Sequence, residues 1–122
     1  MDSQKYTQDP KEIYKLSETL KKYSFKELKK HRHYYDSLLY KNTDEKILER
    51  HYPETQRIKL VIHRIRDNGN ENYDFHYEIS KNQFIVYAID FNKIPPLIIN
   101  GFIVNTNLNN MAKSIKKRYQ KF

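Results

Sequence analysis

The residues best suited to chemistry lie in residues 57–91, where polar and apolar side chains alternate as they do in β-strands. Two histidines of this segment, His63 and His76, flank an Asn68-Gly69 pair, which between two such runs is a strong signal of a β-hairpin turn. This turn would place the two imidazoles diagonally across neighbouring strands, with room for a phosphodiester between them. Imidazoles titrate near neutral pH, so one could take the 2′-hydroxyl proton of RNA and the other could protonate the leaving oxygen. The pattern therefore predicts a ribonuclease site that works without a metal.

Metal-free cleavage of RNA also needs a cation to stabilise the phosphorane. Arg64 could supply this charge, as could Lys59 or Arg66. Asp74, expected opposite His63, would orient that ring and favour its charged form. Tyr87 could give a proton or a surface on which a base stacks. The predicted catalytic residues are His63, His76, Tyr87 and Arg64.

The same residues also fit a sheet that carries no site. His63 with Asp74, and Lys59 with Glu78, could be ordinary cross-strand pairs, each worth roughly 0.2–1 kcal/mol. Several apolar residues share the face that would carry them, so a helix could cover part of it and turn His76 into a core residue. The sequence leaves both interpretations open.

The Asn68-Gly69 turn also predicts how the strands that carry these residues pair with each other. Its register places apolar residues face to face in three pairs: Ile58 with Ile79, Leu60 with Tyr77, and Ile62 with Phe75. A second turn at Lys81-Asn82 would return the chain as a third strand, with Tyr87 opposite His76 on the polar face. Residues 97–104 read as a fourth strand, in which Asn100-Gly101 is a candidate bulge. We therefore predict a four-stranded, mainly antiparallel sheet within residues 57–104.

Helical patterns flank the predicted sheet. Asp9-Pro10 opens a first helix, and Ser24-Phe25-Lys26-Glu27 has the form of a capping box that starts a second helix running to about Tyr40. A short third helix is expected from Asp44, and a basic helix over residues 107–121. The fold class is α+β in a single domain: a helical part at residues 1–52 packed on the sheet, closed by the C-terminal helix.

The chain is strongly basic, with a formal net charge of +8 and a pI near 9.5, which favours an anionic partner. Residues 105–122 contain five Lys or Arg and no acidic residue. We predict nucleic acid, with RNA favoured over DNA, although positive charge could simply keep the protein soluble. The predicted phosphate contacts are Lys26, Lys29, Lys30, Arg32, Lys59, Arg66, Lys113, Lys116, Lys117 and Arg118.

Several classes of function are excluded or disfavoured. The absence of cysteine removes disulfides and zinc-thiolate sites, and scattered acidic residues argue against a two-metal nuclease. His31 and His33 are two apart in the predicted second helix and point away from each other, so they would not share a metal. No metal or cofactor is expected, and the lack of a long apolar run or an apolar leader indicates a cytoplasmic protein without a membrane partner.

Helices followed by an antiparallel sheet bearing His, Arg, Lys and Tyr, in a small basic chain, resemble the RelE/barnase-type superfamily of small ribonucleases, which includes toxins of toxin–antitoxin pairs. The resemblance covers roughly residues 24–122 and rests on architecture and residue types. It implies a site on the sheet at His63, Arg64, His76 and Tyr87, with Arg118-Tyr119 as the basic, Tyr-containing end of such chains. It also implies a cognate antitoxin as a partner.

Three functions remain as hypotheses. The first is a small RNA-directed protein of bacterial, phage or mobile-element origin that acts as a metal-independent, toxin-type endoribonuclease. The second is a regulator that binds nucleic acid without turning it over. The third is a phage or mobile-element protein that inhibits a host protein through its Tyr-rich surface.

Overall fold

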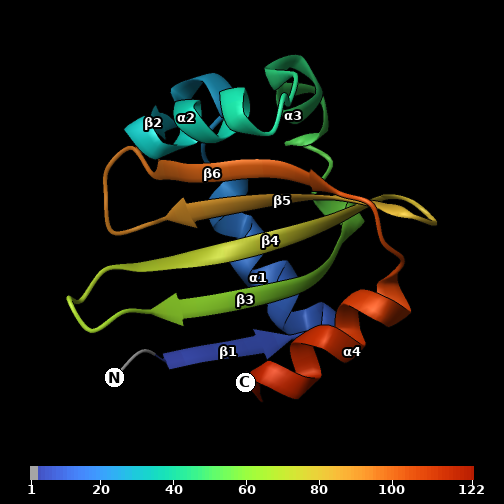
Figure 1. Cartoon of the computed structure of the whole chain (residues 1–122). Helices are drawn as coiled ribbons and strands as arrows, with labels where there is room; N and C mark the ends of the chain where they lie inside the picture. The colour runs from blue at the N-terminus through green and yellow to red at the C-terminus, as the bar shows by residue number, and fades with distance from the viewer. Residues whose placement is uncertain (1–2) are drawn as a thin grey trace.

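A mixed sheet of seven strands organises the part of the chain that the computed structural model describes, residues 3–122 (Figure 1). Its strands are β1 Ser3–Thr7, β2 Lys29–Lys30, β3 Ile58–Ile65, β4 Glu71–Ser80, β5 Gln83–Asp90, β6 Leu97–Val104 and β7 Gln120–Lys121. Their spatial order is β2-β6-β5-β4-β3-β1-β7. The five central strands pair antiparallel, whereas β2 joins β6, and β7 joins β1, in parallel.

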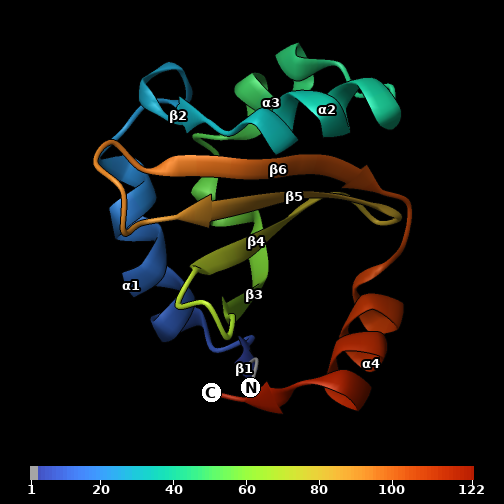
Figure 2. The same ribbon diagram turned by 60° about the vertical axis from the view of Figure 1, so that its left-hand side comes forward.

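Four α-helices lie on this sheet in residues 3–122, so the α+β class is confirmed. They are α1 Pro10–Lys21, α2 Arg32–Tyr40, α3 Glu45–His51 and α4 Leu108–Arg118, with short 3-10 helices η1 Phe25–Glu27 and η2 Thr55–Arg57. The first three pack on one side of the sheet, and α4 packs on the other (Figure 2). Helix α1 begins as its sequence predicts, because Asp9 Oδ1 accepts from the Lys11 amide at 3.0 Å and proline occupies the first turn.

The larger core lies between the sheet and helices α1 to α3. Its largest members are aromatic: Phe25, Tyr34, Tyr52, Phe75, Tyr77 and Tyr87, all buried. Gly101 of β6 lets the helices approach the sheet. A Cβ there would lie 2.9 Å from Leu48 Cδ1 of α3 and 3.4 Å from Tyr34 Cε1 of α2, so a side chain at this position would force the buried Leu48 side chain to shift.

The smaller core lies under α4 on the opposite side. It joins Met111 and Ile115 of α4 to Leu60, Ile62 and Phe84 of the sheet, together with Tyr6 of β1. The α4 helix covers only one end of this sheet face, and the uncovered remainder is where the candidate site lies.

The predicted architecture is wrong in several details: the sheet of residues 3–122 has seven strands instead of four, and the C-terminal helix ends at Arg118, so that Gln120–Lys121 forms β7. The N-terminal part is not wholly helical, because Ser3–Thr7 forms β1 on the edge of β3 and Lys29–Lys30 forms β2. The predicted second helix is split: the Ser24 capping box is present, but it starts only η1. The backbone then bonds to β6, with the His31 amide donating to Ile98 O at 3.0 Å, before α2 begins. With two residues, β2 is too short for a periodic signal, and β1 and β2 are stabilised by pairing with β3 and β6.

The hairpin between β3 and β4 is confirmed, but its predicted register is wrong by one residue. The Arg66 amide donates to Asn70 O at 2.8 Å, so three residues rather than two form the loop. Gly69 has a φ of +83°, whereas Asn68 is not in the left-handed region, so the predicted turn with two positive φ angles does not form.

The register shift changes which side chains of neighbouring strands share a face of the sheet. The strands pair Val61 with Phe75 and Ile62 with Asp74, and the next pair of strands places Tyr87 opposite Phe75 instead of His76. Because side chains alternate from face to face, one residue of shift moves a whole strand's pattern relative to its neighbour. The three predicted apolar pairs are therefore not formed.

Candidate functional site

The structure does not bring together the two predicted catalytic histidines. His76 lies between Leu60 and Val86 on the α4 side of the sheet and is only 6% exposed, and its Nδ1 donates to the Asp74 carbonyl oxygen at 3.0 Å. His63 faces the opposite side, where its Nε2 donates to Glu71 Oε2 at 2.8 Å. The geometry that made them an acid–base pair depended on the wrong register, so the prediction of this pair is wrong.

The other two predicted catalytic residues also separate. Tyr87 is fully buried in the larger core, and its hydroxyl donates to Leu48 O of α3 at 2.7 Å. Burial raises the pKa of this phenol far above its usual value, so it is not placed to exchange a proton with a ligand. Arg64 lies on the other face, where its Nε donates to Asp74 Oδ2 at 2.7 Å and its guanidinium faces the ring of Tyr119.

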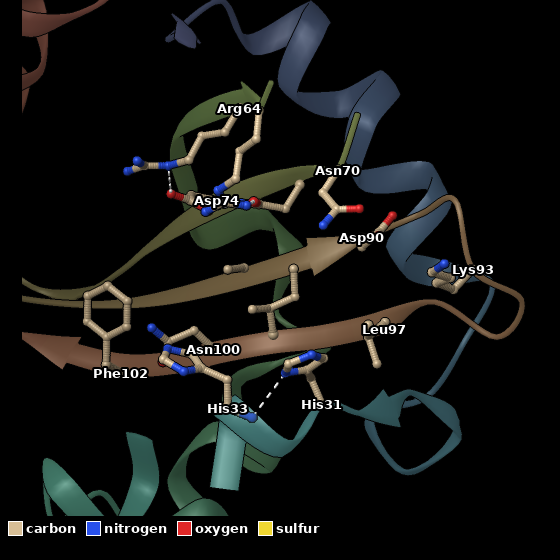
Figure 3. A pocket seen from close by; sticks show the side chains of 14 residues that line it. His31, His33, Arg64, Asn70, Asp74, Asp90, Lys93, Leu97, Asn100 and Phe102 are labelled. Carbon is tan, nitrogen blue, oxygen red and sulfur yellow. Dashed lines mark hydrogen bonds and ion pairs between the residues drawn. The ribbon is translucent and has the colours of Figure 1, made fainter. Parts of the chain in front are cut away.

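Arg64 and Asp74 belong to a cleft of about 710 Å³ on the sheet face that α4 leaves uncovered (Figure 3). Its walls come from strands β3 to β6, from the β3–β4 turn, from the β5–β6 connection and from the start of α2. The lining residues are His31, His33, Arg64, Arg66, Asn70, Asn72, Asp74, Ala88, Asp90, Lys93, Leu97, Ile99, Asn100 and Phe102.

A continuous chain of hydrogen bonds orders one wall of the cleft. Arg66 Nη1 donates to Asn72 Oδ1 at 2.9 Å, Asn72 Nδ2 donates to Asp74 Oδ1 at 2.6 Å, and Asp74 accepts from Arg64 on its other oxygen. Burial disfavours the charged guanidinium, but the Asp74 carboxylate outweighs that effect and raises the pKa of Arg64. The wall therefore presents a fixed, permanently charged arginine and a second, exposed arginine at its rim.

The facing wall carries the two histidines at the start of α2. His31 caps the helix, and its Nδ1 accepts from the His33 amide at 3.0 Å (Figure 3). Because Nδ1 acts as an acceptor, the neutral ring carries its proton on Nε2. The pairing of β2 with β6 brings these residues to the cleft, since β2 ends directly before His31.

Sequence reasoning missed most of this site. The sequence excludes a metal site shared by His31 and His33 and gives these two residues no catalytic role. The amides of Asn70, Asn72 and Asn100 carried no signal, because the cleft forms only when distant strands pair. The alternation of β4 places Asn72 and Asp74 on one face, and this was the one local pattern that could have found them.

The predicted phosphate contacts are dispersed over the molecule. Only Arg66 lines the cleft, and Lys59 borders a shallow cavity near α1 instead. The Nζ of Lys30 donates to Phe25 O at 2.7 Å and to Leu28 O at 3.0 Å, so it is engaged within the fold. The remaining cations are exposed in two groups, near η1 and α2 (Lys26, Lys29, Arg32) and on α4 (Lys113, Lys116, Lys117, Arg118). Figure 1 shows these groups at opposite edges of the sheet.

Within residues 3–122, no group of three or more His, Asp or Glu side chains is arranged to hold a metal ion. None of the helices in this range is long and apolar enough to cross a membrane.

Comparison of the chain with protein-family models, with curated proteins and with solved structures gives no match. The resemblance to RelE/barnase-type ribonucleases therefore remains a prediction. The function proposed for this protein rests on the residues that line the cleft.

The buried imidazole of His76 predicts a pH dependence of stability. Burial lowers the pKa of His76, against the opposing pull of Asp74, so the folded protein holds this ring neutral. As pH falls through about 6.5, the unfolded chain takes up the proton first. The stability that the neutral ring contributes is therefore present above that pH and is lost as pH falls toward the pKa of the folded state.

We expect the His76→Gln substitution to lower the free energy of unfolding more at pH 7.5 than at pH 5.5. Urea unfolding at both pH values, monitored by circular dichroism, measures the difference. An equal loss at the two pH values would show that His76 does not titrate differently in the folded and unfolded states.

Proposed function

We propose that the protein binds RNA in the cleft, with single-stranded RNA as the form that fits. The observation that carries this proposal is the combination, on one concave surface, of cations with amides and aromatic rings. Arg66 and Lys93 can contact phosphates, and the asparagines can bond to base edges. His33 and Phe102 offer flat rings on which bases stack. The cleft volume falls in the range of about 300–1,000 Å³ that is typical of ligand sites.

The single-stranded form is favoured by the shape of the surface. Bases in a duplex are stacked inside and paired, so side chains in a concave cleft reach them only in loops or single strands. The overall charge of +8 would add sequence-independent attraction for the phosphate backbone.

Metal-independent cleavage is the enzymatic form of this proposal, and the two histidines of the cleft favour it. One imidazole would take the 2′-hydroxyl proton while the 2′ oxygen forms a bond to phosphorus. The other would protonate the 5′ oxygen as its bond to phosphorus breaks. Arg64 or Arg66 would stabilise the charge of the phosphorane. In this form His31 and His33 take the roles that the sequence assigned to His63 and His76.

Two matched double substitutions test binding. Arg66→Gln with Lys93→Gln removes two cations from the cleft, and Lys116→Gln with Lys117→Gln removes two from α4. We expect the cleft variant to lose about tenfold in affinity for a labelled single-stranded RNA, because charge-assisted contacts to phosphate are lost. The slope of log affinity against log salt should fall by about two in the cleft variant.

The α4 variant should lose much less affinity, since its cations lie on the far edge of the sheet. Fluorescence anisotropy at several salt concentrations measures both variants, and circular dichroism checks that they fold. An equal loss in the two variants would indicate attraction to net charge alone and would contradict the cleft as the binding surface.

The same RNA, incubated with the protein in EDTA and resolved on a gel, decides between cleavage and binding alone. His31→Asn retains a helix-capping residue, and His33→Gln retains a polar side chain. Cleavage that both substitutions abolish would support the enzymatic form. Binding without turnover would support the regulator. An intact RNA and no binding would leave the inhibitor of a host protein as the remaining hypothesis.

A further inference from the structure

A β-bulge in β6 sets the floor of the cleft. Ala88 pairs with Asn100 and Ile89 pairs with Ile98, so Ile99 is an extra residue on β6. Bulges turn side chains away from the regular alternation and are frequent beside functional sites. Here the bulge sends both Ile99 and Asn100 into the cleft. The sequence predicts a bulge at the Asn100-Gly101 pair, and the bulge lies immediately before it.

The oxygen of the Asn100 amide is buried without a hydrogen-bond partner in the described part of the chain. Buried polar atoms in folded proteins are nearly always paired, and an unpaired one calls for an explanation. Gln4 Oε1 is in the same condition, but that residue is not part of the cleft lining. Among the buried side-chain atoms of the described residues, Asn100 Oδ1 is therefore the unpaired acceptor that belongs to the cleft lining.

An acceptor at this position distinguishes between ligands. A phosphate group at neutral pH offers oxygens that accept hydrogen bonds, so it cannot pair with Oδ1. A nucleobase with an amino group can donate to Oδ1, and an adjacent ring nitrogen can accept from Nδ2 of the same amide. Asparagine makes this two-bond contact with the N6 and N7 atoms of adenine.

The surroundings of Asn100 suit a flat, apolar ring. Ala88 lies opposite on β5 and its small side chain leaves space, while Ile99 and Leu97 add apolar surface. Phe102 stands two residues further along β6, and the Lys41 ammonium lies 3.8 Å from the centre of its ring. Figure 3 shows Asn100 and Phe102 on β6, with the two histidines at the start of α2 below them.

We propose that Asn100 makes the cleft selective for an adenine base. This inference rests on the proposed function, since it names the nucleotide that the RNA-binding cleft accepts. The phosphates contact Arg66 and Lys93 at the rim, and the base lies on the apolar floor with its edge against the Asn100 amide.

Binding of labelled homopolymers of equal length, oligo(A), oligo(C) and oligo(U), to the full chain tests the proposal. The expected result is about tenfold tighter binding of oligo(A) than of oligo(U), in line with one two-bond base contact. Asn100→Leu has nearly the same size but no hydrogen-bonding atoms in its side chain, and it should remove this preference. Its salt slope should match that of the unsubstituted protein, because the substitution removes no phosphate contact.

The control is Asn105→Leu, which makes the same chemical change at an exposed position after β6. It should keep the preference for oligo(A). Urea unfolding of Asn100→Leu provides a measurement without RNA: the variant should be at least as stable as the unsubstituted protein, because an unpaired buried polar atom has been removed.

Four outcomes would overturn the proposal: equal binding of the three homopolymers, a preference for oligo(C) or oligo(U), a preference for oligo(A) that survives Asn100→Leu, or a clear loss of stability in that variant. Each of the first three leaves RNA binding itself in place. Absence of binding to any homopolymer would instead contradict the proposed function, so the two failures are distinguishable.

Discussion

Replacing Tyr87 by alanine is expected to lower the free energy of unfolding by about 3–5 kcal/mol, the range for truncation of a large buried aromatic ring. The ring lies under α2 and α3 and packs edge-on against Tyr77 and Tyr52, with centroids 4.7 and 5.7 Å away. The Tyr87→Phe substitution keeps the ring and removes only the hydroxyl. It should cost about 1–2 kcal/mol, because the Leu48 carbonyl is left without this donor.

Urea unfolding of the two Tyr87 variants measures these costs. Any RNA binding or cleavage by the folded Tyr87→Phe protein should stay within about twofold of the unsubstituted protein. The reason is that the Tyr87 hydroxyl lies on the side of the sheet covered by α1 to α3, away from the cleft. A variant with full stability but no activity would return Tyr87 to the catalytic role that the sequence suggested.

Replacing Arg64 by leucine is expected to lower the free energy of unfolding by about 3 kcal/mol, because breaking a largely buried ion pair leaves the other charge uncompensated. The side chain of Asp74 is only 10% exposed, and without Arg64 its remaining hydrogen bond comes from Asn72. A neutral residue at position 74 should remove most of the penalty.

The double variant Arg64→Leu with Asp74→Asn should therefore recover at least half of the stability that Arg64→Leu loses. The introduced asparagine side chain keeps an acceptor for Asn72 and carries no charge that needs compensation. Urea unfolding of the two single variants and the double variant forms a double-mutant cycle. Additive losses in that cycle would show that the two residues do not stabilise each other and that the pair is not an organising element of the cleft.

Short-range signals in the sequence predicted the parts of the fold that depend on neighbouring residues. Asp9 caps α1, Ser24 and Glu27 form the reciprocal capping box, and Asn107 caps α4 through a 2.8 Å bond to the Asn110 amide. The three hairpin strands and β6 also lie where alternation and turn residues predicted them. Each of these features is decided by contacts within a few residues.

The candidate site could not be predicted in the same way. A loop of three residues instead of two between Arg66 and Asn70 moved His63 and His76 to opposite faces, and the Asn-Gly pair is compatible with either loop. The histidines that do line the cleft depend on the pairing of Lys29–Lys30 with β6, about 70 residues away in the chain. Two adjacent lysines carry no pattern that predicts such a pairing.

The amino-acid sequence by itself determined the α+β class, the starts of α1 and α4, the positions of β3 to β6 and the basic character, because these follow from local hydrogen bonding, alternation and charge. Only the tertiary structure decided which strand faces which, and hence which side chains share a surface. The reason is that alternate residues of a strand point to opposite faces of the sheet. A shift of one residue in the pairing of two strands therefore changes which side chains lie next to each other along the whole strand, and the packing of helices on both sides of the sheet selects the pairing.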